Sequence, residues 1–176
     1  MSDVSDLAEQ VIRRAAEKKL LIAAAESCTA GLVADLLAGV PGASKVFWGS
    51  FVSYTPEAKV RMLGVDAGSL CQYGAVSRET AVSMAKGALE RSGADIAVSV
   101  TGLAGPEGDG SAVPVGTVYI GVAWSNGAKA VAYHFFGSRN EVRRLAAGEA
   151  LGELFRQLEL DIPSANKTAG TVRLKA

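Results

Sequence analysis

Apolar and polar positions along the chain switch repeatedly between helical and strand-like spacing. Apolar residues first recur every three or four positions, at Val4, Leu7, Val11, Ile12 and Ala15, which predicts an amphipathic helix. Further helices are predicted around 32–37, from a Thr55 cap to Gly64, from a Ser77 cap to Gly93, and over about 139–160. Short apolar or alternating runs predict strands at 20–25, 46–54, 95–101, 117–124 and 129–136.

The order of these elements predicts the fold class. The early strands are separated by helices, which favours parallel pairing, whereas the last two strands meet at an Asn126-Gly127 turn, which favours an antiparallel hairpin. We expect an α/β fold, a three-layer sandwich with a mixed sheet and helices on both faces. Residues 1–162 are predicted to form one domain, and the small polar residues of 163–176 a mobile tail.

Composition excludes several classes of protein. Eighteen basic and eighteen acidic residues balance, so the chain lacks the positive excess of a nucleic-acid binder. Its N-terminus is polar and acidic, and no apolar run approaches the ~18 residues of a membrane span. The two cysteines, Cys28 and Cys71, are expected to be free thiols in the cytoplasm. Net neutrality favours self-association, and we expect a homodimer.

Polar residues collect where three predicted strands end. These clusters are Glu26-Ser27-Cys28-Thr29, Tyr54-Thr55 and Thr101-Gly102. Ligands of such sheets bind beyond the carboxyl ends of the strands, so the three clusters are expected to form one site. Considered alone, Ser27 could be a nucleophile near a helix start or an ordinary N-cap residue. Thr29 could equally be the N-cap residue.

The chain offers few groups for catalysis. Its one histidine, His134, lies inside a predicted strand, where a structural role is expected, and a zinc site or a Walker loop has no matching residues. A lysine whose pKa is lowered by burial can activate a hydroxyl instead. Lys59 is predicted to share an apolar helix face with Met62 and Leu63. It could therefore be a buried base, or its aliphatic stem could cover the apolar face while the amine reaches water.

A glycine-rich segment over 102–116 is expected to be a loop. The backbone at Gly102 and Gly105 could cradle a phosphate, although many surface loops have this composition. Arg139 and Arg143 open the last predicted helix and either pair with such a phosphate or are simply solvated.

Several motifs occur together and in a characteristic order. They are Ala25-Glu26-Ser27-Cys28-Thr29-Ala30-Gly31, Tyr54-Thr55-Pro56-Glu57-Ala58-Lys59, Gly74-Ala75-Val76-Ser77, Thr101-Gly102-Leu103-Ala104-Gly105-Pro106 and Pro114-Val115-Gly116-Thr117-Val118. By these motifs the chain resembles the CinA C-terminal domain family, the nicotinamide mononucleotide (NMN) amidohydrolases. The resemblance implies hydrolysis of the NMN carboxamide to nicotinic acid mononucleotide and ammonia, with no metal or organic cofactor.

The resemblance also implies roles for individual residues. Ser27 matches the family's nucleophile and Lys59 its base, and Tyr54 and Thr101 match further residues of the site. The residues expected to contact the substrate are Glu26, Cys28, Thr29, Gly102, Gly105 and Arg139, with Arg139 on the 5′-phosphate. The oxyanion is expected to bind N–H groups near Cys28 and Thr29, with Tyr54 or Thr101 as further donors.

This chain departs from the family pattern at two places. Ala30 stands where a glycine is usual, and Glu107-Gly108-Asp109-Gly110 replaces the usual Asp-Gly-Gly. The family's frequent N-terminal pyrophosphatase-type domain has no counterpart here, so the chain resembles the stand-alone form.

Two other functions stay open on the sequence. Cys28, with its pKa lowered at a helix start, could be the nucleophile with Glu26 and Lys59 assisting. Alternatively, the chain could be a nucleotide-binding or partner-binding module without turnover.

Overall fold

A single five-stranded sheet organises the chain, which the computed structural model describes over residues 4–163. Its strands are β1 (Ile22–Glu26), β2 (Phe47–Val52), β3 (Ile96–Gly102), β4 (Thr117–Trp124) and β5 (Gly127–His134). They lie in the order β2-β1-β3-β4-β5, parallel from β2 to β3 and antiparallel from β3 to β5.

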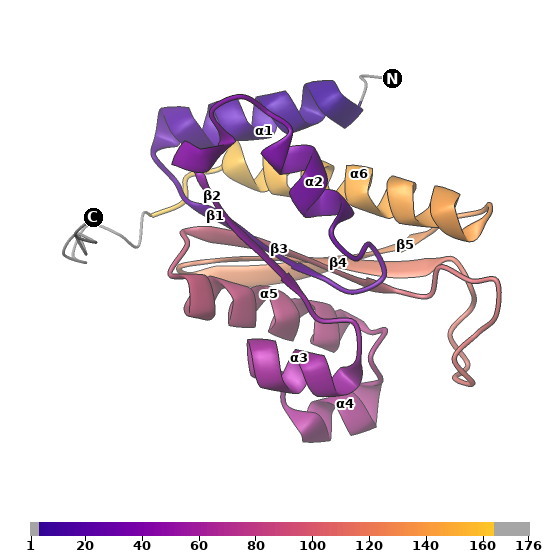
Figure 1. Ribbon diagram of the computed structural model, residues 1–176. Coiled ribbons are helices and arrows are strands. Elements are labelled where there is room, and N and C mark those ends of the chain that lie inside the picture. The colour runs from indigo at the N-terminus through magenta and orange to yellow at the C-terminus, as the bar shows by residue number, and fades with distance from the viewer. Residues whose placement is uncertain (1–3, 164–176) are drawn as a thin grey trace, which may run out of the picture.

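Helices cover both faces of this sheet (Figure 1). One layer consists of α1 (Val4–Lys18), α2 (Leu32–Ala38) and α6 (Arg139–Leu158), and the other of α3 (Pro56–Leu63), α4 (Ala67–Tyr73) and α5 (Arg78–Ser92). A short 3-10 turn, Ala43–Lys45, precedes β2. The predicted α/β three-layer sandwich with a mixed sheet is therefore confirmed.

β1 is buried along its whole length because it lies between two strands and two helical layers. Ile22 and Ala24 pack into the core under α1, α2 and α6, while Ala23 and Ala25 pack into the smaller core on the α5 side. A strand covered on both faces has apolar residues at every position, which explains why the sequence shows a continuous run rather than alternation.

Glycines allow α5 to approach its neighbours closely. A Cβ atom on Gly87 of α5 would lie 2.0 Å from the carbonyl oxygen of Leu63 in α3, and one on Gly121 of β4 would lie 2.5 Å from that of Ala81. These contacts leave no room for a methyl group, so they set the spacing between α3, α5 and the sheet. That spacing matters because α3 also positions Lys59.

Two details differ from the predictions. The helix α4 was not predicted, because none of its residues is buried and it has no apolar periodicity, although Asp66 caps it by accepting from Ser69 N–H at 2.7 Å. The hairpin turn is two residues long, with Trp124 paired to Gly127. Gly127 therefore lies in the strand, where a Cβ atom would meet the Trp124 ring at 2.6 Å.

Other predictions concern parts of the chain that the structure does not describe. The domain bounds 1–162 stay a prediction, and the tail predicted for 163–176 lies, apart from Pro163, outside the described residues. Within residues 4–163, no helix combines the length and the apolar character that crossing a membrane requires.

The close contact at Gly87 predicts that substitution by alanine has opposite effects on stability at Gly87 and at Gly148, a second glycine within a helix. Gly87→Ala should lower the free energy of unfolding by ~1–3 kcal/mol, because the new methyl group collides with the Leu63 carbonyl group. Gly148→Ala in α6 is the control: its Cβ atom would meet only the Val4 side chain, at 3.4 and 3.9 Å, so the gain in helix propensity, up to ~1 kcal/mol, should stabilise the protein. Urea unfolding measures both. Equal effects of the two substitutions would contradict this account of the α3–α5 contact.

Candidate active site

The three polar clusters do meet at one edge of the sheet. Ser27 directly follows β1, Tyr54 lies beyond the end of the neighbouring β2, and Thr101 is near the end of β3 on the other side. In Figure 1 this edge lies on the right, where the loop after β3 and the start of α6 also approach. Two backbone hydrogen bonds extend the ladders past the strand ends, from Ser27 N–H to Val100 at 2.9 Å and from Ser53 N–H to Glu26 at 2.8 Å. The backbone around Ser27 is thereby held from both sides.

Ser27 and Lys59 form a close pair at this edge. Lys59 Nζ lies 2.8 Å from Ser27 Oγ and donates to the Ser53 carbonyl oxygen at 2.9 Å. With the Ser53 carbonyl group accepting one N–H, the lone pair of a neutral amine is free to accept the Ser27 proton. The contribution of Ser53 could not be predicted, because any residue type supplies a carbonyl group.

The start of α3 places the lysine. Thr55 caps the helix by accepting from Ala58 N–H at 3.1 Å, and Pro56 occupies the first helical position. Lys59 then faces inward on the same side as Leu63, and its side chain is only 1% exposed. The alternative of a stem that reaches out to water is therefore wrong. Burial lowers the pKa of Lys59 from 10.5 to about 8.

The environment of Cys28 disfavours it as the nucleophile. Burial raises the pKa of its thiol to about 11, which outweighs the lowering effect of nearby N–H groups and of Lys59 and Arg143. The expectation of a lowered pKa for Cys28 is therefore wrong, because burial dominates. The helix α2 begins only at Leu32, with Gly31 at its N-cap and with no side-chain cap, so neither Ser27 nor Thr29 is its N-cap residue.

Glu26 anchors the turn after β1 from inside the protein. Its fully buried carboxylate accepts from the N–H groups of Gly31 (2.8 Å), Val33 (3.1 Å) and Ala34 (3.0 Å), and from Ser50 Oγ (3.0 Å). The negative charge stabilises the start of α2. Glu26 is thus engaged within the protein, Thr29 is fully buried, and neither residue is among those that line the cavity described below. This geometry leaves neither side chain a contact with a molecule in the cavity, contrary to the expectation.

Tyr54, Gly105 and Arg139 meet across the site. Arg139 donates to the Gly105 carbonyl oxygen at 2.7 Å and to Tyr54 Oη at 2.6 Å. Both acceptors are uncharged, so within the described part of the chain no carboxylate neutralises this guanidinium in an ion pair. The Thr101 hydroxyl group donates its proton to the Ala75 carbonyl oxygen at 2.7 Å. The same proton is then not available for a hydrogen bond to an oxyanion.

Arg143 and His134 lie outside this group. Arg143 donates to the carbonyl oxygens of Cys28 and Thr29, at 2.9 and 3.0 Å, so it supports the turn after β1 instead of facing the cavity. His134, at the end of the edge strand β5, has its ring 3.4 Å from Thr117 Oγ1.

The paired serine and lysine open onto a cavity of about 300 Å³. Its polar lining includes most of the predicted site residues and two further carboxylates from the loop after β3. The lining residues are Ser27, Cys28, Tyr54, Pro56, Lys59, Ala75, Val76, Thr101, Gly102, Leu103, Ala104, Gly105, Glu107, Asp109 and Arg139. Among the residues that the structure describes, no three His, Cys, Asp or Glu side chains group as metal ligands.

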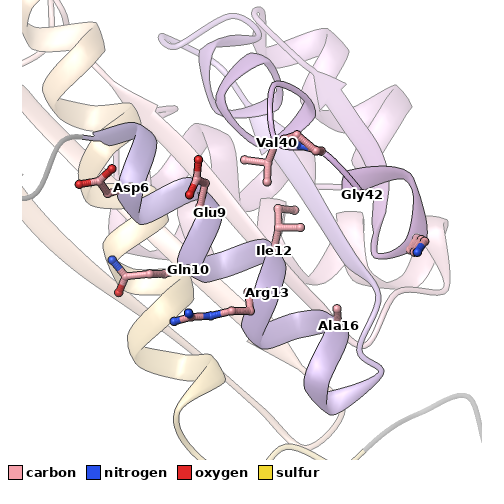
Figure 2. A pocket seen from close by; sticks show the side chains of 10 residues that line it. Asp6, Glu9, Gln10, Ile12, Arg13, Ala16, Val40 and Gly42 are labelled. Carbon is pink, nitrogen blue, oxygen red and sulfur yellow. The ribbon is translucent and has the colours of Figure 1, made fainter.

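A second, wider hollow lies between α1 and the segment 40–45 (Figure 2). It measures about 780 Å³, and charged side chains such as Glu9 and Arg13 line it. Figure 2 shows Ile12 and Val40 pointing toward each other across it. This hollow contains neither the serine nor the buried lysine, so the smaller cavity is the candidate active site.

Comparison with known proteins agrees with this architecture. The model of the CinA C-terminal domain matches residues 4–158. The chain belongs to the CinA C-terminal domain family. A CinA-like protein from Geobacter metallireducens is 46% identical over 148 residues, and one from Syntrophomonas wolfei is 48% identical over 138. The alignments cover 84% and 78% of this chain but 36% and 33% of those proteins, so the chain spans about a third of their length.

Solved structures of this family are similar over more than nine-tenths of their length. The competence/damage inducible protein CihA from Agrobacterium tumefaciens is 40% identical, with a TM-score of 0.82 over 91% of this chain and 98% of that one. A CinA superfamily protein from Escherichia coli is 34% identical, with a TM-score of 0.85 over 90% and 91%.

The buried lysine predicts a specific dependence of stability on pH. The folded state has a Lys59 pKa of about 8 against 10.5 for an unperturbed lysine, so the unfolded chain binds more protons between these values. The stability of the wild type should therefore rise by roughly 2 kcal/mol between pH 7 and pH 10 relative to Lys59→Met. Urea unfolding of both proteins at the two pH values measures this difference. A constant difference would mean that the lysine is not perturbed in the folded state.

Proposed function

We propose that this chain hydrolyses the carboxamide of NMN to nicotinic acid mononucleotide and ammonia, with Ser27 as nucleophile and Lys59 as base. The main support is the 2.8 Å contact between Ser27 Oγ and a lysine amine that is 1% exposed. Membership of the CinA family supports the choice of substrate through the resemblance of the motifs. A cytoplasmic homodimer stays an expectation from composition.

The reaction begins with a proton transfer within the pair. Neutral Lys59 takes the proton of Ser27 as Oγ attacks the carboxamide carbon. Collapse of the tetrahedral intermediate breaks the C–N bond, and Lys59 returns the proton to the departing ammonia. An acyl ester on Ser27 remains. Water, deprotonated by the same lysine, hydrolyses this ester and regenerates the hydroxyl group, so one water is consumed for each ammonia released.

Arg139 and the apolar part of the cavity suit a nucleotide with a phosphate group, although Glu107 and Asp109 also line the cavity. Arg139 has no carboxylate partner among the described residues, and its charge can attract the 5′-phosphate at the rim. The backbone at Gly102 and Gly105 lines the same cavity. Apolar side chains, among them Val76 and Leu103, offer a surface for the pyridine ring. A phosphate contact of this kind would favour the nucleotide over free nicotinamide.

Ammonia release from NMN tests the proposal directly. Ser27→Ala and Lys59→Ala should each lower kcat by at least about 10³-fold, because the nucleophile and its base act as a unit. Cys28→Ala is the matched control next to the nucleophile and should keep most of the activity, since its thiol is protonated at neutral pH. Circular dichroism verifies folding. Loss of activity in Cys28→Ala together with full activity in Ser27→Ala would favour the cysteine, and NMN binding without any ammonia release would favour a binding module.

The pKa of Lys59 predicts the pH profile of this activity. The base acts in its neutral form, so kcat/KM should rise about tenfold per pH unit below pH 8 and level off above it. Initial rates between pH 5.5 and pH 9.5 measure the profile. A flat profile over this range would contradict a lysine base.

A further inference from the structure

The candidate active site contains two carboxylates that the proposed chemistry does not use. Glu107 and Asp109, both from the loop after β3, line the cavity together with Lys59 and Arg139. Charges of both signs thus border one cavity, yet no ion pair within residues 4–163 joins them. A ligand in this cavity therefore meets strong hydrogen-bond acceptors as well as positive charge.

The two carboxylates differ in their own contacts. Asp109 Oδ1 accepts from Ser111 N–H at 3.0 Å, so this carboxylate helps to shape the loop. The side chain of Glu107 takes part in no hydrogen bond or ion pair within the described part of the chain. Both of its oxygens are therefore available to accept hydrogen bonds from a ligand.

The contact between Arg139 and the loop places Glu107 near one end of the proposed substrate. Arg139 donates to the Gly105 carbonyl oxygen at 2.7 Å. Glu107 follows two residues later, so its Cα atom lies within about 7 Å of the Gly105 Cα atom. With the carboxamide at Ser27 and the phosphate at Arg139, the ribose that joins ring and phosphate occupies the part of the cavity next to Arg139. Glu107 belongs to that part of the wall.

We propose that Glu107 is a specificity-determining residue that accepts hydrogen bonds from the 2′- and 3′-hydroxyl groups of the ribose. This inference rests on the proposed function, which supplies the substrate. The two neighbouring hydroxyl groups present two donors side by side, and a carboxylate can accept one bond at each oxygen. Hydrogen bonds to a charged acceptor are stronger than those between neutral groups. The same carboxylate repels the phosphate, so it favours a ligand only when the diol is present.

A purely electrostatic role for Glu107 makes a different prediction. The pyridine ring of NMN carries a positive charge at its quaternary nitrogen, which a nearby carboxylate attracts. This nitrogen has no hydrogen to donate, so the attraction does not involve hydrogen bonds. It would therefore be the same for a ligand with the diol and for one without it.

Calorimetry on combinations of protein and ligand tests the proposal. The proteins are Ser27→Ala, which cannot turn the substrate over, and the same variant combined with Glu107→Ala. The ligands are NMN and its 2′,3′-dideoxy analogue. Glu107→Ala should weaken the binding of NMN by about 10–100-fold, the range expected for hydrogen bonds to a charged acceptor. It should leave the binding of the dideoxy analogue unchanged or make it tighter, because a negative charge near the phosphate is removed.

Two further variants refine the test. Glu107→Gln keeps one oxygen acceptor but loses the charge, so its affinity for NMN should lie between those of the parent and Glu107→Ala. Glu90→Ala is the matched control, because Glu90 is an exposed carboxylate on α5 that does not line the cavity. It should match the parent protein with both ligands.

The outcomes separate this inference from the proposed function. An equal loss of affinity for NMN and for the dideoxy analogue in Glu107→Ala would indicate attraction to the ring and overturn the inference, as would an unchanged affinity for NMN. Ammonia release by the wild type together with either result would leave the proposed chemistry in place. If the wild type releases no ammonia but NMN binds in a way that depends on both the diol and Glu107, the chemistry fails and this inference stands. No binding of NMN to either the wild type or Ser27→Ala would overturn both.

Discussion

The candidate active site depends on a lysine amine that is held inside the protein. Removing an ammonium from water is unfavourable by several kcal/mol, and no carboxylate within residues 4–163 forms an ion pair with Lys59 to offset this. Two neutral oxygens, Ser27 Oγ and the Ser53 carbonyl, take the place of a counter-ion. These oxygens accept hydrogen bonds from the amine but stabilise its positive charge only weakly. Burial therefore lowers the pKa of Lys59 to about 8, and a part of the lysine is neutral near neutral pH.

Holding this amine in place requires rigid surroundings on both sides of the sheet. On the α5 side, Gly87 lets α3 approach closely enough to bring the lysine to the strand ends. On the opposite side, the buried carboxylate of Glu26 ties β1, β2 and the start of α2 together through four hydrogen bonds. The serine lies between these two supports, and its own backbone is bonded to β3.

Some polar residues around the Ser27–Lys59 pair face the cavity, and others hold the surrounding backbone in place. Ser27, Lys59, Tyr54 and Arg139 line the cavity, where a substrate can reach them. Thr101 lines the cavity as well, but it donates its hydroxyl proton to the Ala75 carbonyl oxygen. Glu26 and Arg143 have the same polar character in the sequence but are not among the lining residues, and their hydrogen bonds hold the turn after β1. Polar residues near a strand end therefore serve two purposes, and only the tertiary structure tells which one applies.

The sequence by itself predicted the layered fold and the edge of the sheet where the polar clusters meet. Its resemblance to the CinA family pointed to Ser27 and Lys59, which the residues taken singly left open. Periodicity and caps depend on near neighbours, so they can be interpreted without knowing the fold, and Thr55-Pro56 marked the start of α3 for this reason. Only the tertiary structure decided that Glu26 is an internal anchor, that α2 begins at Leu32, and that the Cys28 thiol has a raised pKa. These properties depend on burial and on partners distant in the chain, such as Arg143 for the carbonyl group of Cys28. The spacing of residues along one segment cannot predict such contacts, because they form only when separate elements pack together.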